Sequence, residues 1–185
     1  MKNDDSPTLF AIIRLFLSAI DILVVFLTVR LFGRLAYKKS YLTGRWFEKI
    51  WSPGWRWAFN GMIRKLFTGH GRGVPWPIGA ACDCGRDVEF SPNELSIFQG
   101  NSYFQTIDGK ISLGKNVWIA RGVCLITTNH DPEAPERHLP GYDIKIGDNC
   151  WIGANAVVMP GVELGPHTVV GANAVVTKSF PVGHC

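Results

Sequence analysis

Aliphatic side chains recur at every sixth position in the last third of the chain. The hexamer Gly-Ala-Asn-Ala-Val-Val at 153–158 also returns letter for letter at 171–176, an offset of 18. A helix repeats every 3.6 residues and a strand every 2, so neither keeps this period. The pattern is typical of a solenoid with three short strands per coil, each strand placing one aliphatic residue inside. Six positions form the register, and four of them precede a glycine: Ile146, Ile152, Val158, Leu164, Val170 and Val176.

The same step continues upstream but is broken once by extra residues. It runs without a gap from Ile107 to Leu125, whereas 91–106 do not fit it. From Leu125 to Ile146 the distance is 21 residues, which is not a multiple of six. We therefore expect a loop of about fifteen residues, 129–143, to leave the coil. A solenoid has no structural need for such an insertion, and loops on rigid scaffolds often carry function.

A long apolar segment, Leu9 to Phe32, precedes the repeats. As a helix it would be about 36 Å long, enough to cross a bilayer core of about 30 Å. If it spans, its polar stripe should face other helices, with Arg14 and Asp21 pairing between subunits. If it lies in the interface, the stripe faces water. The stripe occupies one helical face and consists of Arg14, Ser18, Asp21 and Thr28.

A second, tryptophan-rich helix is predicted within 45–67, after a break at Pro53-Gly54. Its basic side opposes an apolar face, as in helices that lie on a membrane. Covering one end of the solenoid would explain the same apolar face. That face holds Trp55, Ala58, Phe59, Met62, Ile63 and Leu66.

Charge divides the chain into two regions. Residues 1–70 carry eleven Lys or Arg against four Asp or Glu, and residues 71–185 carry eight against eleven. We expect a membrane-associating helical region at 1–70 and a solenoid domain at 71–185. A basic and apolar front favours an anionic membrane surface over nucleic acid, and the basic residues that follow the apolar segment place the solenoid in the cytoplasm. The five cysteines lack framework spacing, so we expect them to be reduced, and we expect no metal.

The predicted loop opens with Asn129-His130-Asp131. A histidine held by a rigid coil suits proton transfer, because its unperturbed pKa lies near neutrality. The alternative is a solvated loop residue. The second ring nitrogen would need an orienting acceptor, for which Asp131, Asn129 and a backbone carbonyl are candidates. Three further loop side chains could touch an acceptor substrate: Arg137, His138 and Tyr142.

Three segments carry a resemblance to a known family: LGKNVWIARGVCLITTNHD at 113–131, IKIGDNCWIGANAVVMPGVELG at 144–165 and VVGANAVVTKSFP at 169–181. They resemble the hexapeptide-repeat acyltransferases, which include the galactoside and maltose O-acetyltransferases and many capsule and exopolysaccharide O-acetyltransferases. The resemblance implies a left-handed parallel β-helix. It also implies a homotrimer with active sites between neighbouring subunits and acetyl-CoA as co-substrate.

The resemblance also implies roles for single residues. His130 corresponds to the catalytic base, and Trp151 to the tryptophan beside the acyl-CoA. Direct transfer follows, because no Ser or Cys nucleophile motif is visible, and the Asn129 amide or a backbone N–H would stabilise the oxyanion. The pantetheine channel corresponds to Gly153, Ala154, Ala172, Thr177 and Lys178. Family members usually continue into a basic arm after this point, so either the sequence is truncated or Lys178 and a neighbouring subunit hold the nucleotide.

The function expected from the sequence is acetyl-CoA-dependent O-acetylation at the inner or plasma membrane. The acceptor would be a sugar hydroxyl of a surface polysaccharide or of its lipid-linked precursor, because the soluble sugar enzymes lack the segment at 9–32. Two alternatives remain open: N-acylation of an amino sugar, and a non-enzymatic trimeric scaffold at the membrane. A carbonic anhydrase of the γ type would need three convergent histidines, which the spacing of His130, His138 and His167 disfavours.

Overall fold

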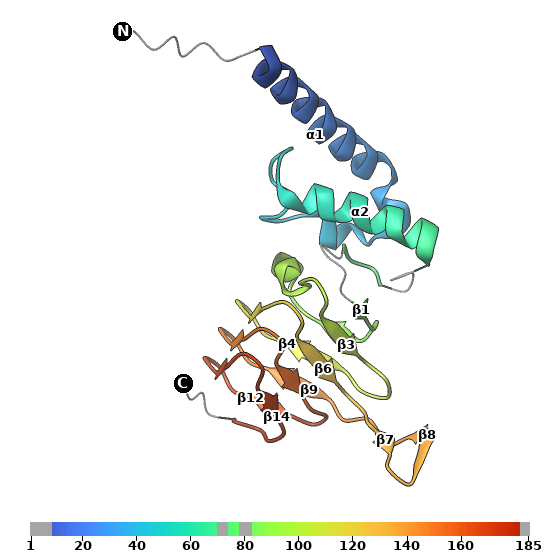
Figure 1. Ribbon diagram of the computed structural model, residues 1–185, viewed down its shortest axis with the longest axis vertical. Helices are drawn as coiled ribbons and strands as arrows, with labels where there is room; N and C mark the ends of the chain where they lie inside the picture. The colour runs from blue at the N-terminus through green and yellow to red at the C-terminus, as the bar shows by residue number, and fades with distance from the viewer. Residues whose placement is uncertain (1–8, 70–73, 78–82, 182–185) are drawn as a thin grey trace.

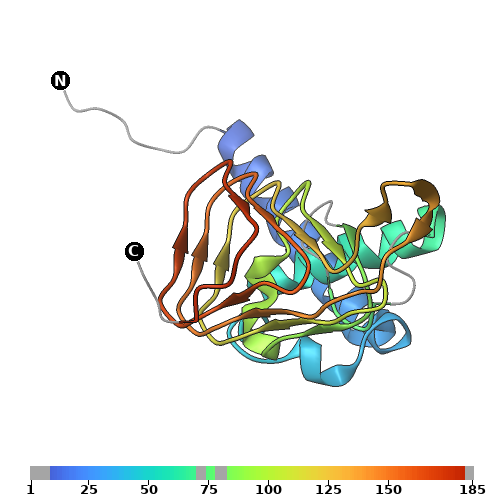
Figure 2. The ribbon, with the colours of Figure 1, turned by 90° about the horizontal axis from the view of Figure 1, so that it is seen from below.

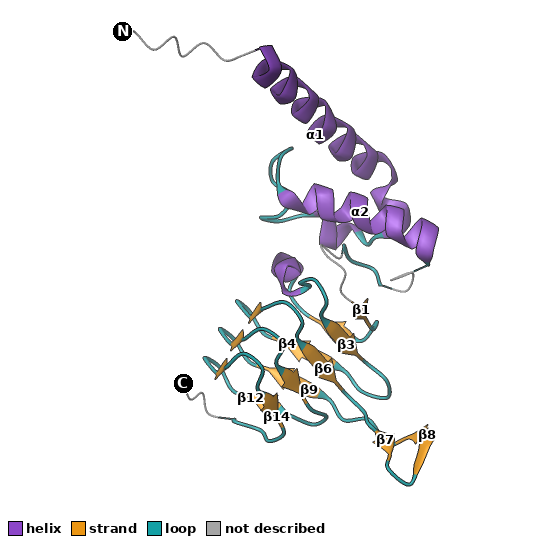
Figure 3. Cartoon of the chain, in the orientation of Figure 1, coloured by secondary structure: helices purple, strands orange, loops and turns teal. Residues whose placement is uncertain are grey.

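The computed structural model describes residues 9–69, 74–77 and 83–181. Helices form one end of the molecule and strands the other (Figure 3). The helices are α1 (Leu9–Ala36), η1 (Lys39–Leu42), α2 (Pro53–Thr68) and η2 (Pro92–Ile97). The strands are β1 (Asp83–Cys84), β2 (Val88–Glu89), β3 (Tyr103–Gln105), β4 (Ile111–Leu113), β5 (Trp118–Ile119), β6 (Cys124–Ile126), β7 (His130–Asp131), β8 (Ala134–His138), β9 (Ile144–Ile146), β10 (Trp151–Ile152), β11 (Val157–Val158), β12 (Glu163–Leu164), β13 (Val169–Val170) and β14 (Val175–Val176).

Three parallel sheets enclose a triangular prism (Figure 2). The first face is β1-β3-β6-β11-β14, the second is β2-β4-β9-β12, and the third is β5-β10-β13. Most strands of these sheets turn one apolar side chain inward, and β4 and β9 turn two. Residues one coil apart therefore stack on each other, as Ile152 does on Val170. All six positions of the six-residue register are buried. The predicted left-handed parallel β-helix is confirmed.

Two of the three corners of the prism repeat closely. The corner from the third face to the first carries Asn101, Gly122, Asn155 and Asn173, all with positive φ. The corner from the second face to the third carries Asn116, Asn149 and His167, also with positive φ. Asparagine tolerates this left-handed conformation better than other side chains do. Stacked amides add side-chain hydrogen bonds of 3.3 Å, from Asn116 to Asn149 and from Asn155 to Asn173.

Gly122→Ala should destabilise the solenoid by about 1–3 kcal/mol, because alanine disfavours positive φ. The added Cβ would also lie 2.2 Å from Asn155 Oδ1. Gly171→Ala is the matched control, since its Cβ would meet no atom within 4 Å, and we expect a change within about 0.5 kcal/mol. Urea unfolding followed by circular dichroism measures both variants. Equal losses of unfolding free energy in the two variants would show that the positive φ at Gly122 does not contribute to stability.

The third corner, from the first face to the second, is irregular, and we call it the loop corner. Leu113 pairs with Ile146 across 33 residues, whereas Ile146 pairs with Leu164 across 18, so one coil holds 15 extra residues. This insertion was predicted. The preceding coil differs from the prediction. Phe104 pairs with Leu125 across 21 residues and takes the inward position predicted for Ile107, whose side chain is 37% exposed.

The coil from Phe104 to Leu125 is three residues longer than a regular coil of 18, and this has a physical reason. The extra residues support the base of the ejected loop, where Lys110 N donates to Asp143 Oδ1 at 2.9 Å and Thr127 Oγ1 donates to Ile107 O at 2.9 Å. Upstream, the stretch that did not fit the register forms η2, which packs on β5. Its buried side chains Leu95 and Ile97 cover the first coil.

α1 and α2 pack against each other, and this contact revises two predictions. Asp21 of α1 forms an ion pair with Arg56 of α2 in the same chain, in place of the predicted pairing with Arg14. Trp55 of α2 is buried and meets Phe26 edge-to-face at 4.8 Å. The predicted apolar face of α2 is thus divided, since its first half contacts α1 while Leu66 remains exposed. α2 lies between α1 and the first coil (Figure 1).

An aromatic column joins the helices to the solenoid. Tyr41 after α1 contacts Trp76 and Phe90 at centroid distances of 5.6 and 5.4 Å. Trp76 stacks on Phe98 at 5.8 Å, and Phe98 contacts the inward-facing Phe104 at 5.7 Å. Large aromatic contacts of this kind contribute beyond their buried area. The helical end is therefore packed continuously onto the solenoid core.

Lys65 of α2 holds the end of α1. Its Nζ donates to Ala36 O at 3.1 Å and to Val74 O at 2.5 Å, and it lies 4.2 Å from the centre of the Tyr37 ring. The last carbonyls of a helix lack partners within the helix, and a cation there is favourable. Burial lowers the pKa of Lys65 from 10.5 to about 8.

We expect Lys65 to make the stability of the protein depend on pH. Its pKa is lower in the folded chain than in the unfolded one, so the unfolded chain binds more protons between about pH 8 and 10.5. The contribution of Lys65 therefore rises with pH across this window. Thermal midpoints of the wild type and Lys65→Met at pH 7, 8.5 and 9.5 should differ increasingly in favour of the wild type. A constant or shrinking difference would contradict the assignment.

Candidate active site

A hairpin leaves the loop corner and carries His130. β7 and β8 pair antiparallel, with His130 opposite His138, and project away from the coils (Figure 1). The base of the hairpin is fixed by hydrogen bonds. Thr128 Oγ1 donates to Leu139 O at 2.6 Å, and Leu139 N donates to Asn129 O at 2.8 Å. The exposed His130 thus stands on a rigid base.

The His130 ring is oriented by a backbone carbonyl. Its Nδ1 lies 2.6 Å from Pro135 O. Because a carbonyl oxygen only accepts, Nδ1 carries the proton and Nε2 is left free to accept one. Of the three orienting groups considered, the structure thus selects the carbonyl. Asp131 instead accepts from Glu133 N at 3.0 Å and pairs with Arg137 at 3.2 Å.

Neutral His130 should occur as the tautomer protonated at Nδ1. Two-bond ¹⁵N–¹H correlation spectra of ¹⁵N-histidine protein above neutral pH distinguish the two tautomers. His130→Gln identifies the signal of this ring. A ring protonated at Nε2 would mean that the hydrogen bond to Pro135 O does not persist in solution.

His138 completes the surroundings of His130. The two ring centroids lie 4.5 Å apart in an edge-to-face arrangement. The sequence identified His138 only as a loop residue. No pattern in the sequence predicts the contact between the two rings or the hydrogen bond to Pro135 O. Both depend on the register of the hairpin, which the six-residue period does not specify.

The residues matched to the cofactor channel lie at three places. Trp151 is exposed on the third face, beside Trp118 and Val169 on the neighbouring strands. Gly153, Ala154 and Ala172 lie together at the next corner, where a Cβ on Gly153 would come 2.6 Å from Ala172 N. Thr177 and Lys178 follow β14 at the loop corner, on the same edge of the prism as the loop.

Within this chain, His130 and Trp151 therefore do not lie together. His130 leaves the corner between the first and second faces, whereas Trp151 lies on the third face. The outer surfaces of the faces also differ. The second is polar, with a Lys145–Glu163 pair at 3.9 Å, whereas large exposed hydrophobic residues stand on the first and third: Tyr103, Val175, Trp118, Trp151 and Val169.

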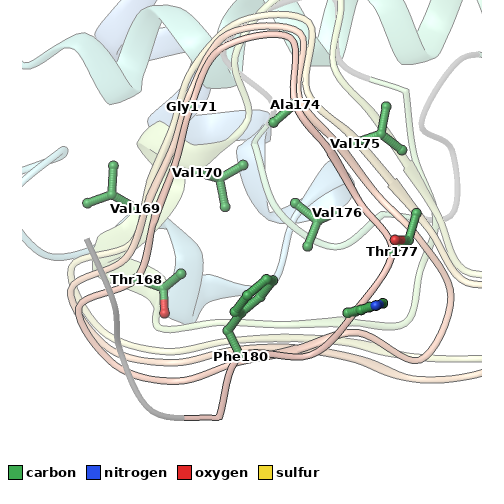
Figure 4. Close-up of a pocket in the computed structure, with 10 residues that line it drawn as sticks. Thr168, Val169, Val170, Gly171, Ala174, Val175, Val176, Thr177 and Phe180 are labelled. Atoms are coloured by element: carbon green, nitrogen blue, oxygen red, sulfur yellow. The ribbon is translucent and has the colours of Figure 1, made fainter.

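A hollow of about 390 Å³ opens on the last coil (Figure 4). Val176 points into it from the first face and Val170 from the third, and Phe180, which pairs with Leu164, points into it from the second. Thr177 and Lys178 form part of its wall. Within residues 9–69, 74–77 and 83–181, no group of three or more His, Cys, Asp or Glu side chains is placed to hold a metal ion.

The repeat region of the chain is similar to known proteins. Residues 143–178 match the family described as bacterial transferase hexapeptide (six repeats). Over 77 residues the chain is 39% identical to the galactoside O-acetyltransferase of Escherichia coli (strain K12), covering 40% of this chain and 38% of that protein. Over 73 residues it is 37% identical to the protein of the same organism described as "Putative colanic acid biosynthesis acetyltransferase WcaF", covering 40% of each.

Among solved structures, a hexapeptide-repeat containing acetyltransferase from Vibrio cholerae aligns with a TM-score of 0.44 at 19% identity, covering 86% of this chain and 83% of that one. The chain spans 36% to 51% of the length of the curated relatives it matches. The sequence match is thus concentrated in the repeats, where the chain carries the bacterial transferase hexapeptide repeat at 143–178 and is similar to known acetyltransferases.

Proposed function

We propose that this protein transfers an acetyl group from acetyl-CoA to a sugar hydroxyl, with His130 as general base. The observation that carries the proposal is the hydrogen bond between His130 Nδ1 and Pro135 O. In the neutral ring this hydrogen bond places the proton on Nδ1, so that Nε2 of the exposed, oriented ring can accept a proton, as a general base must. The names of the relatives in the repeat region support the acetyl group and the hydroxyl acceptor.

The chemistry follows from the reacting groups. A sugar hydroxyl is too weak an acid to attack a thioester unless its proton leaves as the new bond forms. His130 Nε2 takes that proton while the oxygen bonds to the carbonyl carbon. The tetrahedral oxyanion accepts a hydrogen bond from the Asn129 amide, which makes no side-chain hydrogen bond to any described residue. The C–S bond then breaks, and His130 returns the proton to the departing sulfur.

The acetyl-CoA site in this proposal is completed by a second subunit. His130 and Trp151 lie on different sides of the prism in one chain, so a neighbour must supply one of them. The apolar outer surfaces of the first and third faces suit subunit contacts, whereas the polar second face suits water. A homotrimer with threefold symmetry pairs these two faces at each interface and forms three equivalent sites. Gly153, Ala154, Ala172, Thr177 and Lys178 then line the path of the cofactor.

We propose that the acceptor is a lipid-linked or surface glycan at the cytoplasmic side of the inner or plasma membrane. α1 is long and apolar enough to cross a bilayer, and most of its large hydrophobic side chains are exposed. Exposed apolar surface of this extent requires a partner, and lipid is the simplest one. The description of the WcaF relative supports a polysaccharide pathway.

His130→Ala should abolish acetyl transfer and leave acetyl-CoA binding intact. Loss of a general base typically costs a factor of 10² to 10⁴ in rate. Purified protein in detergent, [¹⁴C]acetyl-CoA and extracted lipid-linked glycans give the rate, and thermal shifts with acetyl-CoA give binding. His167→Asn is the matched control, because His167 is an exposed histidine at a regular corner with φ 62°, where asparagine fits.

Other outcomes separate the competing functions. Transfer that survives in His130→Ala would refute the general-base role. A wild type that neither binds nor consumes acetyl-CoA would leave the scaffold as the better explanation. Acetyl product found on nitrogen would replace O-acetylation by N-acetylation of an amino sugar, for which the same base and channel would serve.

A further inference from the structure

A second hollow lies far from the loop, at the junction of the helices. It has a volume of about 230 Å³ and opens between the last turns of α1, the η1 turn and the start of α2. Its lining combines cationic and apolar side chains, and no carboxylate belongs to it. The lining residues are Val29, Arg30, Arg34, Lys39, Leu42, Thr43 and Trp55.

Three cations converge on this hollow. Arg30 and Arg34 are one helical turn apart, so their side chains leave the same face of α1. Lys39 enters from η1. None of the three forms an ion pair with a described residue. Like charges held together repel, and an anion between them would relieve that repulsion. Two guanidinium groups and an ammonium group fit a phosphate, whose oxygens accept several hydrogen bonds at once.

The floor of the hollow is apolar. Val29 and Trp55 are 1% and 5% exposed, and Leu42 packs against the same core. Outside the hollow, the surface of α1 continues with exposed hydrophobic side chains, such as Leu31 at 70% and Phe32 at 53%. A free phosphate gains nothing from such surroundings. A ligand with both a phosphate and a hydrocarbon chain satisfies both parts.

The position along α1 agrees with a lipid ligand. From Leu9 to Arg30 the helix rises by about 32 Å, close to the thickness of a bilayer core of about 30 Å. In a spanning α1, the guanidinium groups therefore reach the layer of lipid phosphates. In an α1 that lies flat, the whole helix is in that layer. The hollow meets lipid phosphates in both arrangements.

We propose that this hollow binds the phosphate group of a membrane lipid, with the hydrocarbon chain of the lipid along the exposed apolar surface of α1. Arg30, Arg34 and Lys39 hold the phosphate, and Trp55 and Val29 contact the first carbons of the chain. The inference rests on the membrane association proposed above. It does not depend on acetyl transfer, and its test uses no activity.

The test is a titration of the full chain in neutral detergent with dioleoyl phosphatidic acid, read by native mass spectrometry. We expect one lipid per chain at saturation. Arg30→Gln/Arg34→Gln should raise the apparent Kd at least tenfold, and Lys39→Gln about fivefold. Lys38→Gln is the matched control: it removes the same charge one residue away, from a side chain outside the hollow, and should change the Kd less than twofold. Equal thermal midpoints of all variants show that the fold is retained.

Two further ligands identify what is recognised. Dioleoylglycerol has the same chains without phosphate, and inorganic phosphate has no chains, so neither should displace phosphatidic acid at millimolar concentration. Equal weakening by Lys38→Gln and Lys39→Gln would reduce the site to diffuse electrostatic attraction and overturn the proposal. Tight binding of dioleoylglycerol, or displacement by micromolar phosphate, would overturn it in favour of apolar adhesion or of a soluble anion.

Discussion

The left-handed conformation of the corner residues is the constraint on which this structure depends. Each regular corner turns the chain through one residue with positive φ, which costs free energy for most side chains and little for asparagine or glycine. Stacked asparagines repeat this solution from coil to coil, 18 residues apart for Asn155 and Asn173 and 33 apart for Asn116 and Asn149, and each corner fixes the position of the next strand. These two corners keep the same length in every coil from β4 to β14. The third corner is the place where the chain admits extra residues.

The candidate chemistry follows from that division. At the loop corner, Gly109 fits closely against Thr127 and Tyr142, and three residues added to the coil above support the base of the hairpin. His130 therefore projects from a closely packed and hydrogen-bonded support, although it belongs to an irregular segment. A base that must meet a hydroxyl and a thioester together benefits from such a support, because the ordering cost is met when the protein folds.

The repeat made most of the solenoid predictable from the sequence. Outside the ejected loop, stacking requires equivalent residues 18 positions apart, so the six-residue step identifies one buried position per strand from Leu113 to Leu125 and again from Ile146 to Val176. Prediction was wrong at Ile107, where the local insertion moves Phe104 into the core. The sequence also did not identify the group that accepts the hydrogen bond from His130 Nδ1, because the register of a hairpin is set by local turns. The Asp21–Arg56 pair depends on helix packing, which no period encodes.

The aromatic column from Tyr41 to Phe104 has a consequence for the choice of acceptor. It joins the helices to the first coil through direct ring contacts. Parallel strands are about 4.8 Å apart, and β6 is the third strand of its face, so the hairpin leaves the prism about 10 Å beyond β1. If the helices rest on a lipid surface, as proposed, the distance between that surface and the hairpin is fixed. The protein would select a hydroxyl by its height above the lipid, so that the position of a sugar in a glycan matters as much as its identity.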